Sequence, residues 1–350
     1  MSGSVELLLD LTLPELEARL REWQQPAYRA RQVWDWVYKQ GATQFAQMTN
    51  LPVALRERLA AEFTLTPFEP VAEHLSTDGQ TRKLALRLAD GEIIESVWMR
   101  YETRESVCVS TQAGCAMGCA FCATGQGGLR RNLTAGEIVG QVLAFARLLA
   151  PQSRVTNVVF MGMGEPFANY DAVWKAVSIL MHPAGLGLGA RHIVISTVGL
   201  IPGIRRFAQE RSQVRLAVSL HAPDDALRDQ LVPINRAHPI GPLMDAIRYY
   251  VNLTGRRVTF EYALIASVND SPEQAQALAA LLRGLPVHVN LIPLNPVAGS
   301  PWRPSPRDRV RQFQATLEER GIPCTVRLGR GTDIQAACGQ LRARTLQPDV

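Results

Sequence analysis

The chain has 350 residues, 47% of them apolar and 20% charged, and a formal net charge of +5 at pH 7. This composition is that of a globular protein with room for one large or two medium domains, and no apolar run approaches the length of a membrane span. Six cysteines in so long a chain do not indicate a disulfide framework, so we expect a cytoplasmic protein with no membrane partner, and the basic excess is compatible with a polyanion.

Helical runs are predicted between about residues 7 and 63. Thr12 is a candidate N-cap of the first helix, because a proline and a glutamate follow it just inside the run. A second amphipathic run covers residues 28–38, where apolar side chains recur at helical spacing. We expect residues 1–70 to form a small helical domain.

A β-hairpin is predicted next. Residues 82–88 and 91–100 alternate like strands and are joined through Asp90-Gly91, a strong hairpin signal. We expect this hairpin to be the core of a linker, residues 71–104, between the helical domain and a larger one. Glu95 lies in its second strand, where a carboxylate is usually on the solvated face.

Three cysteines, Cys115, Cys119 and Cys122, follow the apolar strand-like run 107–110. Thiolates are soft ligands that suit iron–sulfur clusters, zinc or Cu(I). A structural zinc site would need a fourth ligand nearby, but the next histidine is His182, and a thioredoxin-like Cys-x-x-Cys pair would leave the third cysteine unexplained. A [4Fe–4S] cube normally takes four protein thiolates. We therefore predict one [4Fe–4S] cluster with an iron open to a non-protein ligand, and keep zinc and a redox pair as alternatives.

Strand-like and helical runs alternate from about residue 107, which favours βα units and a parallel sheet. The strand-like runs are 107–110, 156–161, 192–197, 215–219, 258–264 and 287–292, and the helical runs between them include 137–149, 171–181, 240–251 and 273–282. Six units predict an α/β partial barrel over residues 105–300, with functional residues at the C-terminal strand ends. A proline-rich loop, a helix over 308–319, a short strand over 324–327 and a glycine-rich tail form a C-terminal extension, residues 301–350.

Polar residues follow several of the predicted strands. Gly164 and Glu165 come after the second strand, where glycine lets a ligand approach the backbone and the carboxylate can accept a hydrogen bond from an ammonium group. Further candidates at later strand ends are Ser196, Ser219, Leu220, His221 and Asn295. Any one of them alone is typical of a cap or a turn, but together they predict a binding site.

The cysteine loop resembles that of the radical S-adenosylmethionine (radical SAM) enzymes, in which the open iron binds the amino and carboxylate groups of SAM. The segment 162–166 is similar to the Gly-Gly-Glu-type motif that holds the SAM amino group in that family. The resemblance implies a partial (βα)6 TIM-like barrel, and it implies that the hydroxyl, imidazole and amide groups at the other strand ends hold the ribose and adenine.

A narrower resemblance covers nearly the full length. The tail 331–341, Gly-Thr-Asp-Ile-Gln-Ala-Ala-Cys-Gly-Gln-Leu, closely resembles the C-terminal motif of the RlmN/Cfr family of radical SAM RNA methyltransferases. Further matching segments are 28–32, 48–52, 108–115, 191–199 and 219–223. The departure at Ala266-Ser267, where Asp-Gly is expected, lies away from the proposed chemistry.

This family resemblance implies two SAM molecules per turnover. One methylates Cys338, and the second is cleaved at the cluster to a 5′-deoxyadenosyl radical that takes hydrogen from the new methyl group. The sulfur-bound methylene radical then adds to the adenine ring of the RNA, with Glu95 as the proton acceptor. Cys108 resolves the covalent adduct, leaving a Cys108–Cys338 disulfide. We expect Cys324 to be inert.

The implied substrates are adenosine 2503 of 23S rRNA and adenosine 37 of certain tRNAs, gripped in part by the helical N-terminal domain. RlmN-type members methylate carbon 2 of adenine and Cfr-type members carbon 8, and the overall match favours carbon 2. The resemblance also implies a flavodoxin-like electron donor and a disulfide reductant, and we expect a monomer. The rival hypotheses are another radical SAM branch, such as a protein-activating enzyme, and a non-catalytic RNA-binding protein with a structural metal.

Overall fold

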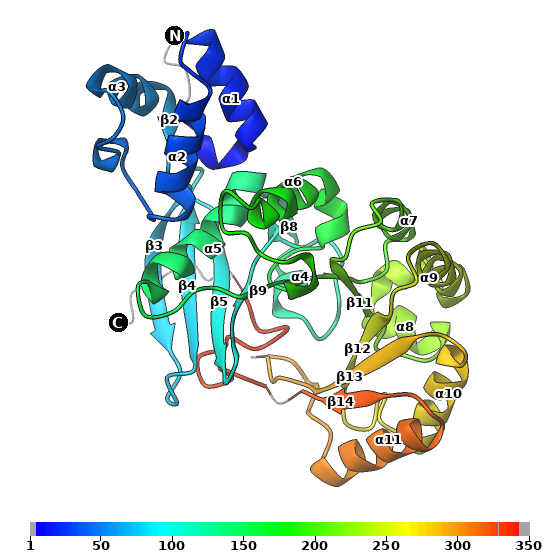
Figure 1. The fold of residues 1–350 in the computed structure, drawn as a ribbon. Coiled ribbons are helices and arrows are strands. Elements are labelled where there is room, and N and C mark those ends of the chain that lie inside the picture. The colour runs from blue at the N-terminus through cyan, green and yellow to red at the C-terminus, as the bar shows by residue number, and fades with distance from the viewer. Residues whose placement is uncertain (1–4, 298, 328, 343–350) are drawn as a thin grey trace.

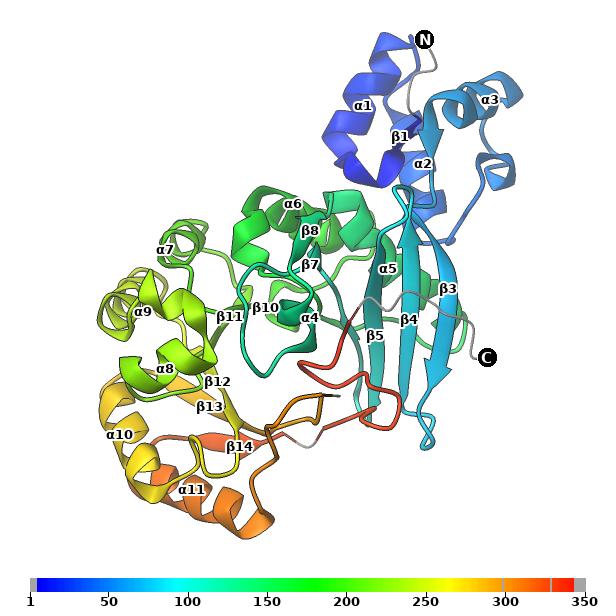
Figure 2. The same ribbon diagram turned by 180° about the vertical axis from the view of Figure 1, so that it is seen from behind.

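A ten-stranded sheet organises the computed structural model, which describes residues 5–297, 299–327 and 329–342. The strand order is β14-β13-β12-β11-β10-β9-β6-β5-β4-β3 (Figures 1 and 2). The strands are β3 (Phe68–Leu75), β4 (Thr81–Leu88), β5 (Ile93–Tyr101), β6 (Arg104–Cys108), β9 (Asn157–Phe160), β10 (Ile193–Thr197), β11 (Arg215–Ser219), β12 (Val258–Leu264), β13 (Val287–Pro293) and β14 (Cys324–Val326).

The run from β6 to β14 is entirely parallel and forms the open barrel. The six predicted strands lie in it within a few residues of their expected bounds, which confirms the α/β radical SAM-type fold. The short strand predicted over 324–327 is β14, and it adds a seventh parallel strand beside β13. The first part of the C-terminal extension thereby completes the sheet.

Helices cover the outer face of this arc (Figures 1 and 2). They are α5 (Ala135–Leu149), α6 (Tyr170–Met181), α7 (Ile201–Gln209), α8 (Asp225–Leu231), α9 (Ile240–Thr254), α10 (Pro272–Leu282) and α11 (Arg307–Glu319). The two that the sequence did not indicate are α7 and α8, which are short, and α7 contains both a proline and a glycine. Among the described residues, no helix is long and apolar enough to cross a bilayer.

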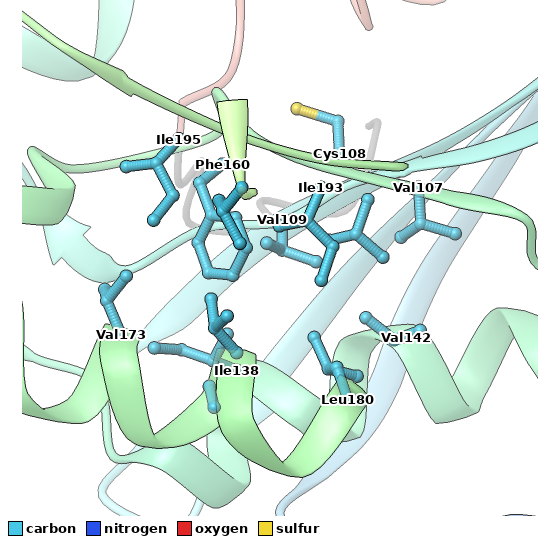
Figure 3. Packing of buried hydrophobic residues seen from close by; sticks show 14 of the residues in the cluster. Val107, Cys108, Val109, Ile138, Val142, Phe160, Val173, Leu180, Ile193 and Ile195 are labelled. Atoms are coloured by element: carbon cyan, nitrogen blue, oxygen red, sulfur yellow. The ribbon is translucent and has the colours of Figure 1, made fainter. Parts of the chain in front are cut away.

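The main core lies between these helices and the sheet. Figure 3 shows Ile138 and Val142 of α5 and Leu180 of α6 beneath the buried strand residues. The side chains that meet them include Val107, Phe160, Ile193 and Ile195 of the strands and Val109, which directly follows β6. Cys108 lies between Val107 and Val109 in the chain. Because side chains alternate along a strand, its sulfur points to the opposite face of the sheet (Figure 3).

The predicted hairpin is present as β4 and β5, but it also belongs to the main sheet. β5 pairs antiparallel with β6, and β3 pairs antiparallel with β4, so three antiparallel strands extend the barrel at one edge. The sequence did not indicate β3, because most of its side chains are exposed and a register shift at Pro70 interrupts its alternation.

The N-terminal residues form the expected helical unit at one end of the molecule (Figure 1). Its helices are α1 (Leu13–Glu22), α2 (Tyr28–Tyr38) and α3 (Val53–Glu62), and the short strands β1 (Glu6–Leu7) and β2 (Phe63–Thr64) pair beside them. Thr12 caps α1 through a capping box with Glu15. Trp34 and Tyr38 of α2 are buried core residues.

Candidate active site

A short hairpin holds the cysteine loop closed. The strands β7 (Gln112–Gly114) and β8 (Leu129–Asn132) pair on either side of it, and the N–H of Cys115 donates to the carbonyl of Gly128 at 2.9 Å. Gly114 has φ +79°, and a Cβ at this position would collide with the same carbonyl. Glycine is therefore required at the base of the loop.

Apolar packing fixes the other side of the loop. Cys119 belongs to a small buried cluster with Leu231, Val232, Ile265 and Leu294, separate from the main core. The N–H of Ala120, next to Cys119, donates to the carbonyl of Leu231 at 3.0 Å. The loop is thus anchored to the barrel at Cys119 by buried apolar contacts and a backbone hydrogen bond.

One cavity brings together ten of the residues that the sequence proposed. It is lined by Cys115, Cys119, Cys122, Gly164, Glu165, Ser196, Ser219, His221, Asn295 and Cys338. The other three proposed residues lie elsewhere. Leu220 is fully buried and does not line the cavity, while Cys108 and Glu95 line two neighbouring pockets.

The three loop cysteines fit a thiolate-held cluster. Burial raises the pKa of Cys115 to about 11, and that of Cys119 is also raised, first by burial and then by the neighbouring Cys122 and Cys115. Such thiols need a strong positive centre to hold them as thiolates. In the described part of the chain, no three His, Cys, Asp or Glu residues gather as they would around one metal ion. A [4Fe–4S] cube instead distributes its thiolates over separate irons.

Glu165 is buried at the end of β9. Its carboxylate accepts hydrogen bonds from the backbone N–H groups of Phe167 at 3.0 Å and Val198 at 2.9 Å, and burial raises its pKa to about 7. Glycine is also required by packing just before it. A Cβ on Gly162 would press on Val109 and Ser110, and one on Gly164 would press on Gln112, while Gly164 also lines the cavity.

Arg228 of α8 holds the strand ends that carry several of these groups. It is fully buried, and its guanidinium donates to the carbonyls of Val198 at 2.6 Å, Ser219 at 3.1 Å and Leu220 at 3.0 Å. Leu220 therefore contributes its backbone to the scaffold and not a side chain to the cavity. Arg228 was not predicted from the sequence, because an arginine on a short helix is usually exposed.

His221 is held in one orientation at φ +61°. Its Nδ1 accepts the N–H of Ala263 at 2.9 Å, and its ring meets Phe121 edge-on at 4.7 Å between centroids. Burial, and then the charge of Arg228, lower its pKa to about 3. The imidazole is therefore neutral in the folded protein at any physiological pH.

This pKa predicts acid sensitivity. Because the folded chain holds His221 neutral, its contribution to stability is complete above pH 6.5 and is lost as the pH falls through 6.5 towards 3. Between pH 7 and pH 5 the loss should be about 2 kcal/mol of unfolding free energy. Urea unfolding over this range should show that His221→Asn reduces the slope, whereas the same change at the exposed His74 leaves it as it was. Equal slopes for all three proteins would contradict the assignment.

The C-terminal segment 331–341 lies against the cysteine loop (Figure 2). Two hydrogen bonds come from the residues after the cysteine loop: the N–H of Ala123 donates to the Gly339 carbonyl at 2.8 Å, and the hydroxyl of Thr124 donates to the Leu341 carbonyl at 2.6 Å. Two more join the segment to the end of β13: Asn295 Nδ2 donates to the Cys338 carbonyl at 3.0 Å, and Gln340 Nε2 donates to the Pro296 carbonyl at 2.7 Å. Asp333 accepts hydrogen bonds from Thr77 in the β3–β4 turn. Contacts on three sides therefore place Cys338 at the cavity.

Cys338 lines two cavities at once. One contains the loop cysteines, and the other, a smaller one, contains Cys108. Cys108 is 7% exposed, and burial followed by the proximity of Cys338 raises its pKa to about 12. Both cysteines are free thiols in this structure. The fold thus brings together two residues that are 230 positions apart in the chain.

Glu95 is buried, contrary to the usual position of a strand carboxylate. Its Oε1 lies 2.9 Å from Nζ of Lys83 on β4, and its Oε2 accepts the backbone N–H of Arg342 at 2.8 Å. It lines a pocket with His74 and Gln335 that is distinct from the cavity of the cysteines. The structure therefore places Glu95 beside the C-terminal segment but not among the SAM-site candidates.

The Lys83–Glu95 pair predicts a stability effect. Both side chains are more than nine-tenths buried, so Lys83→Met should leave an unpaired buried carboxylate and cost about 3–5 kcal/mol of unfolding free energy. The double variant Lys83→Met/Glu95→Gln should recover much of this loss. Chemical unfolding would test both, with Arg248→Met, which breaks an exposed pair, costing no more than about 1 kcal/mol. A small effect of Lys83→Met alone would contradict the prediction.

Two charged residues of the cavity were missed by sequence reasoning. Glu261 on β12 is buried, and its carboxylate accepts from Asn290 Nδ2 at 2.9 Å and pairs with Arg327 Nη1 at 3.3 Å. Arg327 follows β14. The available signal was the single carboxylate inside the apolar run 258–264.

Comparisons with known proteins identify relatives of the whole chain. The chain matches the ribosomal RNA large subunit methyltransferase N-terminal domain over residues 7–65 and the radical SAM superfamily over residues 109–279. It is 52% identical to the "probable dual-specificity RNA methyltransferase RlmN" of Roseiflexus sp. (strain RS-1), covering 95% of each chain, and 53% identical to that of Chloroflexus aurantiacus, covering 97% of this chain and 94% of the other. A crystal structure of a radical SAM methyltransferase from Sphaerobacter thermophilus superposes with a TM-score of 0.95 at 55% identity, covering 97% of this chain and all of that one.

Proposed function

The chain belongs to the RlmN family of radical SAM RNA methyltransferases, and on this premise we propose that it methylates carbon 2 of adenosine 2503 in 23S rRNA and of adenosine 37 in tRNAs. The observation that carries the proposal is the position of Cys338 between the cavity of the loop cysteines and the cavity of Cys108. A methyl carrier must reach both the radical source and the thiol that later resolves the adduct. The position of Cys338, which lines both cavities, supports its assignment to both roles.

Cys115, Cys119 and Cys122 would hold one [4Fe–4S] cluster, with SAM at its open iron. When bound, these groups supply the electron and the radical that remove hydrogen from a methyl group. Gly164, Glu165, Ser196, Ser219, His221 and Asn295 would orient SAM from the strand ends. In this assignment the buried Glu165 meets the SAM ammonium, and that pairing would offset the cost of its ionisation.

Cys338 would take a methyl group from a first SAM and present it to a second, so that two SAM are used per turnover. Its sulfur carries the methylene unit to the adenine and becomes covalently joined to the RNA. Glu95, ion-paired with Lys83, would accept the proton from the ring carbon once the adenine lies over the C-terminal segment. The Cys108 thiol would then attack the Cys338 sulfur, releasing the methylated base and leaving a disulfide.

The roles proposed for the domains and for the partner proteins follow from the same catalytic cycle. Residues 1–70 would bind RNA, and residues 71–104 would link them to the barrel at 105–300. Residues 301–350 would carry Cys338, and of these residues 328 and 343–350 lie outside the described part of the chain. A flavodoxin-like protein would supply electrons and a thiol reductant would reopen the disulfide. We propose that the enzyme acts as a monomer.

The decisive experiment locates the new methyl group. Anaerobically purified, cluster-reconstituted protein is given SAM and 23S rRNA that carries deuterium at carbon 2 or carbon 8 of adenine, and the nucleosides are analysed by mass spectrometry. Loss of the carbon 2 label supports the proposal, whereas loss of the carbon 8 label would assign Cfr-type chemistry. SAM cleavage without methylated adenosine would rule out this substrate.

A further inference from the structure

Arg327 lies at the boundary between the two cavities that meet at Cys338. Its backbone N–H donates to the carbonyl of Leu291 on β13 at 2.8 Å, which fixes its position just beyond β14. Its side chain lines both the cavity of the loop cysteines and the smaller cavity of Cys108. Arg327 therefore adjoins the same two spaces that Cys338 does.

A buried carboxylate holds this guanidinium in place. Nη1 of Arg327 lies 3.3 Å from Oε2 of Glu261, while the other oxygen of Glu261 accepts from Asn290. Glu261 is 4% exposed, and burial raises its pKa, with the charge of Arg327 acting against that rise. The Arg327 side chain is 31% exposed, so the pair is only partly buried: a buried carboxylate holds a guanidinium in the wall of the cavity. The positive charge of Arg327 is therefore available to groups that line the two cavities.

The positive charge of Arg327 acts on the sulfur of Cys108, which lines the smaller cavity with it. Burial and the neighbouring Cys338 raise the pKa of the Cys108 thiol, while the backbone of Met161 and the positive charge of Arg327 oppose that rise. At Cys108 the result is a pKa of about 12. A thiol with so high a pKa is a poor leaving group in disulfide exchange. A positive charge near the Cys108 sulfur therefore increases the rate at which the disulfide is reduced.

We propose that Arg327, oriented by Glu261, stabilises the Cys108 thiolate that leaves when the Cys108–Cys338 disulfide is reduced. This role rests on the proposed function, because only that cycle makes the disulfide. Cys338 is the exposed partner and Cys108 the buried one, so an external reductant reaches the Cys338 sulfur. Arg327 thus stabilises the leaving group during regeneration of the enzyme, and Glu261 is the positioning residue that orients Arg327.

The step balances with a dithiol as the reductant. One thiolate of the dithiol attacks the Cys338 sulfur, the S–S bond breaks, and Cys108 leaves with the electron pair beside Arg327 and then takes a proton. The second thiol of the reductant displaces Cys338 from the mixed disulfide. Two electrons and two protons pass to the cysteine pair, and the dithiol becomes a cyclic disulfide.

The test measures how fast this disulfide is reduced in the full-length protein. After turnover, excess dithiothreitol is added anaerobically, free thiols are trapped with iodoacetamide at set times, and the Cys108 and Cys338 peptides are quantified by mass spectrometry. Arg327→Gln should slow reduction about tenfold, as expected for loss of one charge interaction in a partly buried site. Arg327→Lys should restore most of the rate.

Two controls make the result specific. Arg248→Gln removes the same charge from an exposed position and should leave the rate unchanged. Alkylation of Cys324, whose thiol lies near Glu318, should be equal in all samples and reports on general access. Because Arg327→Gln leaves Glu261 buried without its partner, the double variant Arg327→Gln/Glu261→Gln provides a second, charge-balanced test, and it should also be slow.

The outcomes separate the two proposals. If the disulfide forms, and in Arg327→Gln or in the double variant it is reduced as fast as in the unsubstituted protein, the role of Arg327 is wrong and the proposed function stands. If the unsubstituted protein forms no Cys108–Cys338 disulfide during turnover, the proposed cycle itself fails.

Discussion

Replacing Cys338 with alanine is expected to abolish RNA methylation, by a factor of about 10³ or more, while SAM is still cleaved under reducing conditions. The physical reason is that the adenine ring carbon is too weak a nucleophile to take a methyl group from SAM directly, so loss of the carrier sulfur removes the route. The segment should still fold, because Asn295 and Gly339 hold it through backbone groups that alanine keeps. Iron content and 5′-deoxyadenosine release would be measured beside methylated nucleosides.

The matched control for this experiment is Cys324→Ala. Cys324 is another free cysteine of the C-terminal region, but its sulfur faces Gln314 and Glu318 of α11 and not the active-site cavity. We expect it to retain full methylation. Full activity of Cys338→Ala would instead favour another radical SAM branch, in which no carrier cysteine is needed.

Much of the barrel was predictable because its determinants are local. The six parallel strands are short apolar runs, and the helices after them repeat at helical spacing, so periodicity alone places elements such as β12 and α5. The cysteine loop was equally readable, since three ligands lie within eight residues. The family resemblance then extended the interpretation to Cys338, which no local pattern connects to the loop.

What sequence reasoning missed depends on long-range packing. In the sequence Arg228 is an ordinary helix residue, and only the folded chain brings the ends of β10 and β11 to its guanidinium. Glu95 was expected at a solvated face because the hairpin appeared to have one, but Lys83 and the C-terminal segment cover it. Leu220 belonged to a matched motif, and only the structure shows that its side chain is in the core.

Replacing Cys108 with alanine should arrest the enzyme after a single turnover, with the RNA covalently attached to Cys338. In the proposed cycle Cys108 supplies the only thiol that lines the small cavity beside Cys338, as far as the described residues show, so its loss leaves the adduct without an internal nucleophile. Cys108 points away from the α5–α6 side of the sheet and lines a small cavity, so alanine there leaves the packing against α5 and α6 in place and the fold should persist (Figure 3). Denaturing gel electrophoresis with labelled RNA would show the adduct as a slowly migrating band in nearly stoichiometric yield.

The double variant Cys108→Ala/Cys338→Ala distinguishes a trapped intermediate from non-specific cross-linking. It should give no adduct, because the carrier sulfur that forms the bond to RNA is gone. Multiple turnovers by Cys108→Ala would mean that an external thiol or another route resolves the adduct, and the Cys108–Cys338 disulfide would then lie outside the cycle. An adduct that requires Cys338 and accumulates only without Cys108 would assign opposite roles to the two thiols that share this cavity: one forms the bond to RNA and the other breaks it.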